Sequence, residues 1–353
     1  MPQAPADHEL RCLFEDQGFF AGSSTMLPLL RQAKKAATVS DITILVEGET
    51  GTGKQVLAEA IHRLDEKRKS FPFVTVHCST ISEALAESEL FGHQRGAFSG
   101  ATRDREGLFH TAHRGTLFLD DVSDLPLTLQ PKLLDVVQRG IVRGVGSDRE
   151  VPVNVRIIAA TNQPLAPLVQ QNRFRADLYY RLNVVRLHLP PLRERPGDLT
   201  TLVLAFARRH RHIYPHITEV EDDLIQALRS QRFQGNIREL EHAVQRMLFS
   251  KTEGSSLTLA DWTQQAGEAT PPCDEELLRE AAQRLWIAIY DHRVPYGVAF
   301  RRLERKLLET VLLVEGHTRR DIARRLSTSE RTLYQKLRTH QLSHPSVAGE
   351  DIG

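Results

Sequence analysis

The stretch Glu47-Gly48-Glu49-Thr50-Gly51-Thr52-Gly53-Lys54 decides the fold of this chain. It follows the apolar, β-branched run 42–46 and precedes the helical pattern of 56–61. Strand, glycine loop and helix are the context in which G-x-x-x-x-G-K binds phosphate. The glycines let backbone N–H groups curl around an anion, and Lys54 reaches the β- and γ-phosphates beside a helix N-terminus. The sequence therefore predicts an α/β fold with a nucleoside triphosphate site.

Two acids follow a second expected strand, Gly115-Thr116-Leu117-Phe118-Leu119-Asp120-Asp121. Gln55 stands where many phosphate loops place a Ser or Thr hydroxyl on Mg²⁺, so other groups must hold the metal. An acid at the end of a strand beside the loop can hold Mg²⁺, and a second can orient the attacking water. We assign Asp120 to the metal and Asp121 to the water. The alternative is an ordinary strand followed by a solvated acidic turn.

A third expected strand, 153–160, ends in Thr161 and Asn162. Polar residues at this point lie at the carboxyl edge of the sheet, where ligands bind in open α/β folds. Both side chains are therefore candidates for sensing the γ-phosphate. A Thr-Asn pair is also an ordinary turn or cap signal.

The segment Gly96-Ala97-Phe98-Ser99-Gly100-Ala101 places an aromatic residue among small residues in an expected loop. Together with the features above, it resembles the AAA+ domain of sigma-54-dependent transcription activators, the bacterial enhancer-binding proteins. That family carries the loop signature G-A-F-T-G-A, and here Ser99 replaces Thr. The resemblance covers residues 19–250 and implies that this loop engages the sigma-54 subunit of RNA polymerase. The alternative is a loop whose Phe98 tucks back into the core.

Further segments match the same family. The segment 174–182 looks like the arginine-finger segment, so Arg175 and Arg181 would reach the nucleotide of a neighbouring subunit and stabilise charge in the transition state. Gly235-Asn236-Ile237-Arg238 resembles the second sensor, in which Arg238 contacts nucleotide within its own subunit. The resemblance implies ATP and Mg²⁺ as cofactors and self-assembly from dimers into a ring, a hexamer in the family.

The chain departs from the family at a functional pair. The family has Asn before Cys and Asp-Glu after the acidic strand, whereas this chain has His77-Cys78 and Asp120-Asp121. In the family the Asn holds the catalytic Glu until the γ-phosphate is sensed. We hypothesise that His77 reaches Asp121 and preserves this switch. The rival interpretation is a slow or poorly gated hydrolase.

The last part of the chain is basic. Residues 301–340 hold eleven Lys and Arg against five Asp and Glu, although the whole chain has a net charge of +1. A basic end on a near-neutral protein is typical of nucleic-acid binding. Three short apolar helical patterns separated by Gly316 and residues 327–329 predict a helix-turn-helix, which resembles the DNA-binding domain of the same family. The outward candidates for contact with double-stranded DNA are Arg319, Ser329, Arg331, Thr332, Tyr334, Gln335 and Arg338. The alternative is a three-helix bundle with a solvated basic face.

Length and composition fit several domains. No apolar run approaches the length that spans a membrane, and the three cysteines are too scattered for a zinc site or a disulfide framework, so we expect a cytoplasmic protein. The N-terminus leaves no room for a regulatory domain, so regulation would come from a separate protein, from expression level, or from nucleotide and DNA. We divide the chain into an N-terminal extension 1–18, an AAA+ core 19–190, a helical lid 191–250, a linker with an amphipathic helix 251–300, a helix-turn-helix domain 301–342 and a tail 343–353.

These observations predict a DNA-binding ATPase that activates sigma-54-dependent transcription by remodelling the closed promoter complex. Two alternatives come from other classes. One is a nucleotide-sensing DNA-binding repressor, and the other is an AAA+ ATPase of replication or DNA remodelling.

Overall fold

The computed structural model describes residues 5–79, 83–98 and 101–266, and single positions at 298, 302, 304–306, 308 and 337. The chain divides into two units, Met1–Glu268 and Ala269–Gly353, and the elements described below belong to the first. The predicted amphipathic helix within 251–300 and all seven candidate DNA-binding residues lie outside the described part.

A five-stranded sheet forms the centre of the first unit, in the order β2-β5-β8-β1-β9. All neighbouring strands run parallel, so their carboxyl ends meet at one edge. The predicted parallel α/β fold is therefore confirmed. The strands are β1 (Ile44–Glu47), β2 (Phe73–His77), β5 (Thr116–Asp120), β8 (Arg156–Thr161) and β9 (Val185–His188).

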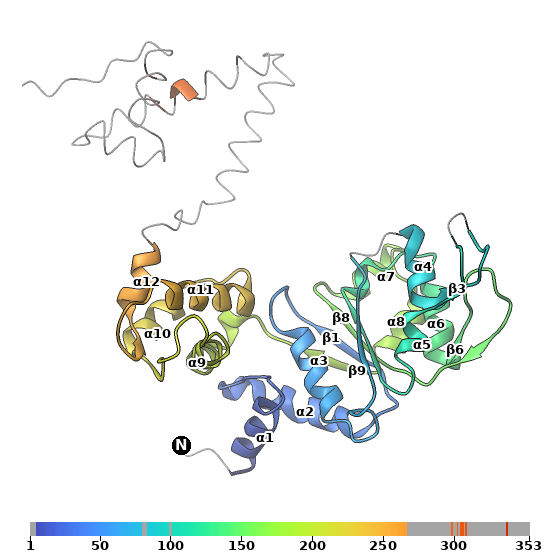
Figure 1. Cartoon of the computed structure of the whole chain (residues 1–353), viewed down its shortest axis with the longest axis horizontal. Coiled ribbons are helices and arrows are strands. Elements are labelled where there is room, and N and C mark those ends of the chain that lie inside the picture. Colours follow the sequence, from blue (N-terminus) through green and yellow to red (C-terminus); the bar gives the residue numbers. More distant parts are fainter. Residues whose placement is uncertain are drawn as a thin grey trace, which may run out of the picture. The chain divides into compact units, whose positions relative to one another are not determined.

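Helices cover both faces of this sheet because its central strands alternate between two apolar clusters. Ile44 and Val46 pack with the N-terminal helices, whereas Leu45 between them packs in the cluster of the later helices. The two sets lie on opposite sides of the strands in Figure 1. The first set is α1 (Pro5–Glu15), α2 (Leu27–Thr38) and α3 (Lys54–Arg63). The second is α4 (Glu83–Phe91), α5 (Leu108–Thr111), α6 (Gln130–Arg139), α7 (Leu165–Gln170) and α8 (Ala176–Leu182).

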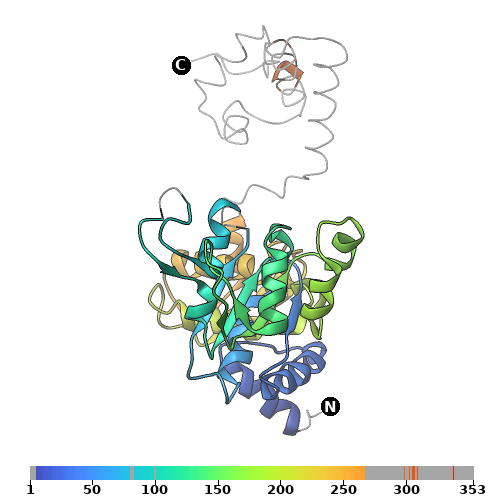
Figure 2. The same cartoon turned by 90° about the vertical axis from the view of Figure 1, so that its right-hand side faces the viewer.

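The N-terminal segment is part of the packed core. We predicted only a short extension up to residue 18, but α1 buries Leu10 and Phe14 in the cluster shared with α2 and α3. The blue helices at the lower end of Figure 2 are this N-terminal group. None of the helices in the described part is long and apolar enough to cross a membrane.

A helical lid with its own apolar cluster follows the sheet. It contains α9 (Leu199–Arg209), α10 (Asp222–Arg229), α11 (Asn236–Ser250) and α12 (Leu259–Ala266), joined to the core through the short 3-10 turns η3 (Leu192–Glu194) and η4 (Pro196–Asp198). A parallel pair, β10 (Glu219–Val220) and β11 (Ser256–Leu257), closes it.

The lid extends beyond the predicted boundary at residue 250. We predicted a linker from residue 251, but Leu257 is fully buried and Trp262 packs against the lid cluster. The ammonium of Lys251 also lies 2.7 Å from Asp261 Oδ2, with both side chains largely buried. The Gly- and Ser-containing stretch is therefore a turn inside the lid, because the apolar residues after it complete the cluster.

Two antiparallel hairpins project from the core beside α4 and α6. The first pairs β3 (Gly92–His93) with β4 (Arg105–Glu106), and the second pairs β6 (Ile141–Val142) with β7 (Val151–Pro152). Val145, in the loop of the second hairpin, forms a β-bridge with His93 of the first and so joins the two hairpins.

A buried ion pair joins the start of β8 to the residues after α3. Arg156 Nη1 lies 2.6 Å from Asp65 Oδ2, and both side chains are almost fully buried. Burial lowers the pKa of the Arg156 guanidinium, although Asp65 opposes this shift. Arg156 also donates a 2.6 Å hydrogen bond to the carbonyl of Ala36.

We expect Asp65→Asn to lower the free energy of unfolding by about 3–5 kcal/mol, because it leaves the Arg156 charge buried without its partner. Urea unfolding followed by circular dichroism measures this loss. The matched control is Glu66→Gln, which breaks an exposed pair with Lys69 and should cost less than about 1 kcal/mol. Equal losses in the two variants would show that the buried pair contributes no more than the surface one.

Candidate active site

The phosphate loop, residues 48–53, joins β1 to α3 as predicted. Gly51 and Gly53 have φ angles of 77° and 99°, which favour glycine. A Cβ atom at Gly51 would lie 2.2 Å from the carbonyl oxygen of Gly235 in the lid. The glycine is therefore needed both for its backbone conformation and for the close approach of the lid.

The side chain of Lys54 lies across this loop. Its Nζ donates hydrogen bonds to the carbonyl oxygens of Gly48 and Glu49 at 2.8 and 3.2 Å. Burial lowers the pKa of the Lys54 ammonium, while Asp121 and Asp120 act in the opposite direction. The cation therefore shares one electrostatic environment with the two acids of β5.

Gln55 points along α3 rather than into the loop. Its Nε2 donates a 3.0 Å hydrogen bond to Glu59 Oε1, one turn further along the helix. This geometry agrees with the sequence-based argument that Gln55 does not replace a metal-binding hydroxyl. Thr52 is fully buried, and its hydroxyl donates to the Glu49 carbonyl at 2.7 Å.

Asp120 ends β5 beside His77, the last residue of β2. His77 Nδ1 lies 3.2 Å from Asp120 Oδ2. We predicted that His77 reaches Asp121, but the hydrogen bond that the structure gives runs to Asp120. The reason is the parallel register, which places His77 directly opposite Asp120 and lets the chain turn away after it.

Asp121 occupies a constrained position. Its φ of 51° is left-handed, a conformation that Asp tolerates better than most residues. Burial and the neighbouring Asp120 raise the pKa of its carboxyl, and Lys54 lowers it. Its Oδ1 is buried without a hydrogen-bond partner among the described residues. A carboxylate with a raised pKa and a free, buried oxygen suits the orientation of a water molecule.

Replacing Asp121 by Glu and His77 by Asn tests this pair. We expect kcat for ATP hydrolysis to rise by about 10- to 100-fold, because the present carboxyl is one methylene short and His77 is held by Asp120. Steady-state phosphate release measures the rate. Asp124→Glu, which lengthens an exposed acid nearby, is the control. An unchanged kcat in the double variant would mean that the pair His77–Asp120 already compensates.

The two candidate sensors at the end of β8 differ in their surroundings. Thr161 is fully buried, its hydroxyl donates to the Gln163 carbonyl at 2.7 Å, and its own carbonyl accepts from Gly48 N at 3.2 Å. Asn162 is exposed at the same sheet edge. Thr161 thus stabilises the turn and the phosphate loop. Of these two candidate sensors, Asn162 is the one whose side chain is accessible to a ligand.

The two candidate finger arginines lie at the two ends of α8, which packs on α6 and α7. Arg175 precedes the helix and forms a bidentate pair with Asp177, with distances of 3.0 and 2.8 Å. Hydrogen bonding to Asp177 raises the pKa of the Arg175 guanidinium. Arg181 is exposed in the last turn. Within the described ranges, no hydrogen bond or ion pair joins either arginine to the phosphate loop.

Arg238 lies beside the phosphate loop, since its Cβ would be 3.4 Å from a Cβ at Gly51. Three further lid-side residues touch the loop but were not among the predicted site residues: Asn236, Arg193 and Arg195. Asn236 lies in the second-sensor segment, where only Arg238 was given a role. The two arginines lie in the segment 189–195, which resembles the family's join between core and lid, and nothing in the local sequence indicates their contacts with the loop.

The Gly96–Ala101 loop sits at the tip of the first hairpin. Gly96 N donates to the Ala101 carbonyl at 2.8 Å, while Ser99 and Gly100 lie outside the described residues. The Phe98 side chain is 39% exposed, and its ring meets that of His93 edge-on, with centroids 5.0 Å apart. Phe98 therefore rests on the surface instead of entering the core.

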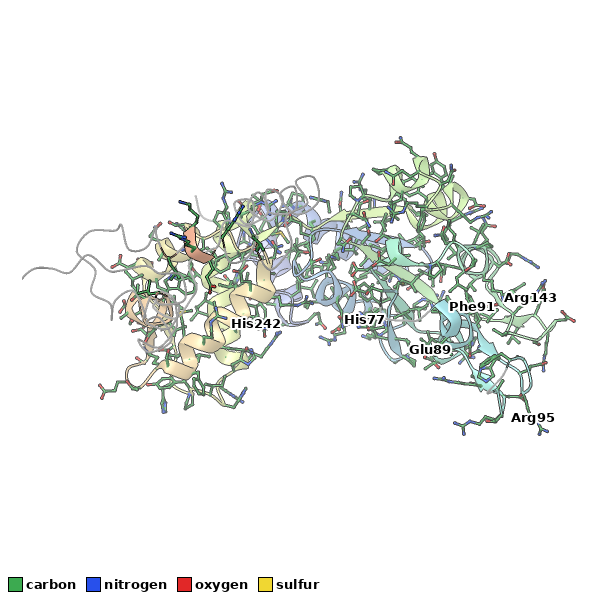
Figure 3. The ribbon with its side chains drawn as sticks, turned by 90° about the horizontal axis from the view of Figure 1, so that it is seen from above. His77, Glu89, Phe91, Arg95, Arg143 and His242 are labelled. Carbon is green, nitrogen blue, oxygen red and sulfur yellow. The ribbon has the colours of Figure 1, made fainter. Side chains whose placement is uncertain are left out.

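Arginines surround this tip. Arg95 and Arg143 point outward at the end of the core, well away from His77 (Figure 3). The second hairpin supports the loop, because Gln94 N donates to the Val145 carbonyl at 3.1 Å and Ala97 abuts Gly146. Two hairpins that contact each other thus hold the loop that carries Phe98.

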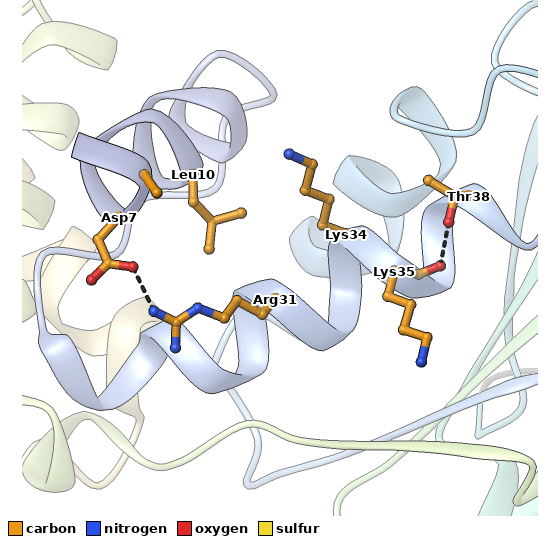
Figure 4. A pocket seen from close by; sticks show the side chains of 7 residues that line it. Asp7, Leu10, Arg31, Lys34, Lys35 and Thr38 are labelled. Carbon is orange, nitrogen blue, oxygen red and sulfur yellow. Dashed lines mark hydrogen bonds and ion pairs between the residues drawn. The ribbon is translucent and has the colours of Figure 1, made fainter. Parts of the chain in front are cut away.

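A shallow pocket of about 440 Å³ lies between α1 and α2 (Figure 4). Its lining includes the surface ion pair of Arg31 Nη2 with Asp7 Oδ1 at 2.5 Å, together with Lys34 and Lys35. It contains none of the predicted site residues.

The parallel sheet, the phosphate loop, the acids after β5 and the lid on the loop together define an AAA+ ATPase domain. Residues 19–188 match the model of the sigma-54 interaction domain, and residues 193–276 match that of the AAA+ ATPase lid domain. The chain therefore carries a sigma-54 interaction domain followed by an AAA+ ATPase lid, as the resemblance predicted.

Known proteins agree with this assignment. The chain is 48% identical over 238 residues to the DNA-binding transcriptional activator HyfR of Escherichia coli K12, with 67% of this chain and 35% of HyfR covered. It is 42% identical over 245 residues to the anaerobic nitric oxide reductase transcription regulator NorR of Aeromonas hydrophila, with 69% and 48% covered. The crystal structure of NtrX from Brucella abortus in complex with ATP is similar, with a TM-score of 0.65, 28% identity and coverage of 92% of this chain and 69% of that one. The chain thus spans between 35% and 48% of the length of these two curated relatives.

Proposed function

We propose that this protein is an ATPase that activates sigma-54-dependent transcription by remodelling the closed complex of RNA polymerase at a promoter. The observation that carries the proposal is the presence, in one unit, of a phosphate loop contacted by its lid and a hairpin that exposes Phe98 at its tip. The first can sense and hydrolyse a nucleotide, and the second offers an aromatic contact. Such a protein acts on the polymerase in the cytoplasm.

The residues present fit ATP and Mg²⁺. Lys54 and N–H groups of the loop 48–53 would hold the phosphates, and Asn162 and Arg238 would contact them, which the exposure of Asn162 and the closeness of Arg238 to Gly51 support. The acids Asp120 and Asp121 would hold the metal and the attacking water, since Asp121 keeps a buried oxygen without a partner in the described part of the chain. Mg²⁺ held there would supply positive charge that offsets the charge of the phosphates.

Hydrolysis depends on a second copy of the chain. Arg175 and Arg181 project from the α8 region without touching the phosphate loop of their own subunit within the described ranges. In a ring, each would reach the site of the next subunit and stabilise the transferred phosphoryl group. We therefore propose assembly from dimers into a hexamer-like ring, and activity only when assembled.

The acids and the projecting loop are linked along the chain, with residues 80–82 outside the described part. His77 bonds to Asp120 and ends β2, and the chain continues through α4 into the hairpin of β3. A change in the contacts of Asp120 on hydrolysis would move His77 and, through α4, the loop that carries Phe98. We propose that this movement pushes the loop onto sigma-54 and so remodels the polymerase complex.

We further propose that the basic segment 301–342 binds double-stranded DNA upstream of the promoter as a helix-turn-helix. The excess of positive charge in this segment supports the proposal. The name of the relative HyfR, a DNA-binding transcriptional activator, agrees with it.

Phe98→Ala tests the proposal directly. We expect kcat for ATP hydrolysis to stay within about twofold, while activated transcription from a sigma-54 promoter falls by about 30-fold, because an aromatic anchor is typically worth about 2 kcal/mol. In vitro transcription with ATP, and with a non-hydrolysable analogue, measures activation. Leu127→Ala removes another exposed apolar side chain and serves as control. Open-complex formation that survives in Phe98→Ala would refute the loop assignment, and hydrolysis without any activation by the wild type would favour the nucleotide-sensing repressor.

A further inference from the structure

Every carbonyl oxygen of the phosphate loop from Gly48 to Thr52 accepts a hydrogen bond. Lys54 Nζ donates to the first two, at 2.8 and 3.2 Å. The other three donors come from the lid side of the molecule. They are Asn236 Nδ2 to the Thr50 carbonyl at 3.0 Å, Ile237 N to the Gly51 carbonyl at 2.9 Å and Arg195 Nη2 to the Thr52 carbonyl at 2.7 Å.

Asn236 lies within this contact between the phosphate loop and the lid. It is fully buried, and its φ of 55° directs the start of α11 towards the loop. Its Oδ1 accepts a 2.9 Å hydrogen bond from Leu192 N in the segment that joins core and lid, and its Nδ2 also reaches Glu49 Oε2 at 3.2 Å. One amide thus connects the loop, the joining segment and the lid.

Charged groups reinforce the same contact. Arg193 forms a bidentate pair with Glu49, at 2.8 and 2.6 Å. Hydrogen bonds from Arg193 and then Asn236 hold the pKa of the Glu49 carboxyl below its usual range. Arg195 is fully buried beside Asp198, with Nη1 lying 3.6 Å from Oδ2. Burying a guanidinium is costly unless it is paired and hydrogen-bonded, and its bond to Thr52 helps to meet that condition.

These donors decide where the N–H groups of the loop point. In a planar peptide the C=O and the following N–H point in opposite directions. Fixing the carbonyls of residues 50 and 52 from the lid side therefore turns the N–H groups of Gly51 and Gly53 towards the other side of the loop, while the N–H of Thr52 donates to the Glu49 carbonyl at 3.4 Å. N–H groups that converge in this way form an anion-binding nest.

We propose that Asn236 and Arg195 are positioning residues that preorganise the phosphate loop as a nest, so that lid position and affinity for polyphosphate are coupled. The inference rests on the proposed ATP site and needs neither sigma-54 nor DNA. Because coupling is reciprocal, bound polyphosphate must strengthen the lid contacts by the same factor by which the lid strengthens binding.

The test uses the full chain and two probes, tripolyphosphate with Mg²⁺ and ATP with Mg²⁺, in isothermal titration calorimetry. Asn236→Asp keeps the acceptor for Leu192 N, removes the donor to Thr50 and places a second carboxylate beside Glu49. We expect the Kd of both probes to rise by at least about tenfold, the equivalent of one lost donor. Adding Glu49→Gln removes the repulsion but leaves the donor to Thr50 missing, so the double variant should still bind both probes at least about tenfold more weakly than the Glu49→Gln single variant. Recovery to the affinity of the single variant would assign the loss to repulsion and overturn the role of the donor.

Asn172→Asp is the matched control, because Asn172 also has a positive φ of 54° but is exposed. It should leave both affinities unchanged. A folded Asn236→Asp protein with wild-type affinity for tripolyphosphate would overturn the proposal.

Amide hydrogen exchange of the wild type provides a second test that no folding defect can obscure. The Ile237 amide, bonded to the Gly51 carbonyl, should exchange at least about tenfold more slowly when tripolyphosphate is bound. Unchanged exchange would refute the coupling. Failure of the wild type to bind either probe would instead remove the ATP site itself, whereas failure to activate transcription would leave this inference intact.

Discussion

We expect Lys54→Ala to lower kcat/KM for ATP hydrolysis by about 10³-fold or more, because the variant loses the cation that we propose contacts the phosphates in a largely buried site. Lys54 is only 7% exposed, so solvent water cannot substitute for the positive charge that the variant loses. Steady-state hydrolysis and calorimetric titration with ATP measure the loss.

The same variant should bind DNA like the wild type, since the basic segment 301–342 is separate from the phosphate loop in sequence. Lys69→Ala, which removes an exposed lysine paired with Glu66, is the control for charge. A thermal melt checks the fold, because Lys54 also bonds to the carbonyls of Gly48 and Glu49. If hydrolysis and DNA binding fell together, the two activities would not belong to separable modules.

Arg181→Ala should lower kcat by about 10³- to 10⁵-fold, as expected for a finger supplied in trans, while the Kd for ATP stays unchanged. Arg181 is the better choice of the two fingers because it is exposed, whereas Arg175 is already paired with Asp177. Arg229→Ala is the control, since this arginine occupies the last turn of α10 as Arg181 does that of α8.

Mixing the two inactive variants distinguishes action in trans from action within one subunit. In a mixed ring, the phosphate loop of an Arg181→Ala subunit can meet the intact finger of a Lys54→Ala neighbour. Hydrolysis should therefore return in the mixture, to a level set by the fraction of such boundaries. A mixture as inactive as its components would contradict a shared site.

Much of the site could be predicted from local sequence. The phosphate loop, the acids after β5 and the polar end of β8 each follow an apolar strand, and parallel strands bring their carboxyl ends to one edge. The family signature marked the loop with Phe98 before its hairpin was visible. Short-range patterns sufficed because each feature lies within a few residues of the strand that positions it.

Predictions that depended on partners distant in sequence were less accurate. His77 was expected to reach Asp121, yet the register of β2 and β5 directs it to Asp120. The lid was expected to end at residue 250, yet α12 completes its apolar cluster. Neither result can be read from a window of sequence, since both depend on which residues become neighbours in three dimensions.

The sequence by itself determined that this chain folds as a parallel α/β domain with a phosphate loop, two acids and an aromatic-tipped loop, because periodicity and spacing act over short distances. Only the tertiary structure decided how the loop is held. Residues 195, 236 and 237 donate to carbonyls more than 140 positions earlier in the chain, and the contacts exist because the joining segment returns the lid to the loop. A carbonyl accepts from whichever donor the fold brings near it, so its partner is a property of the packed molecule.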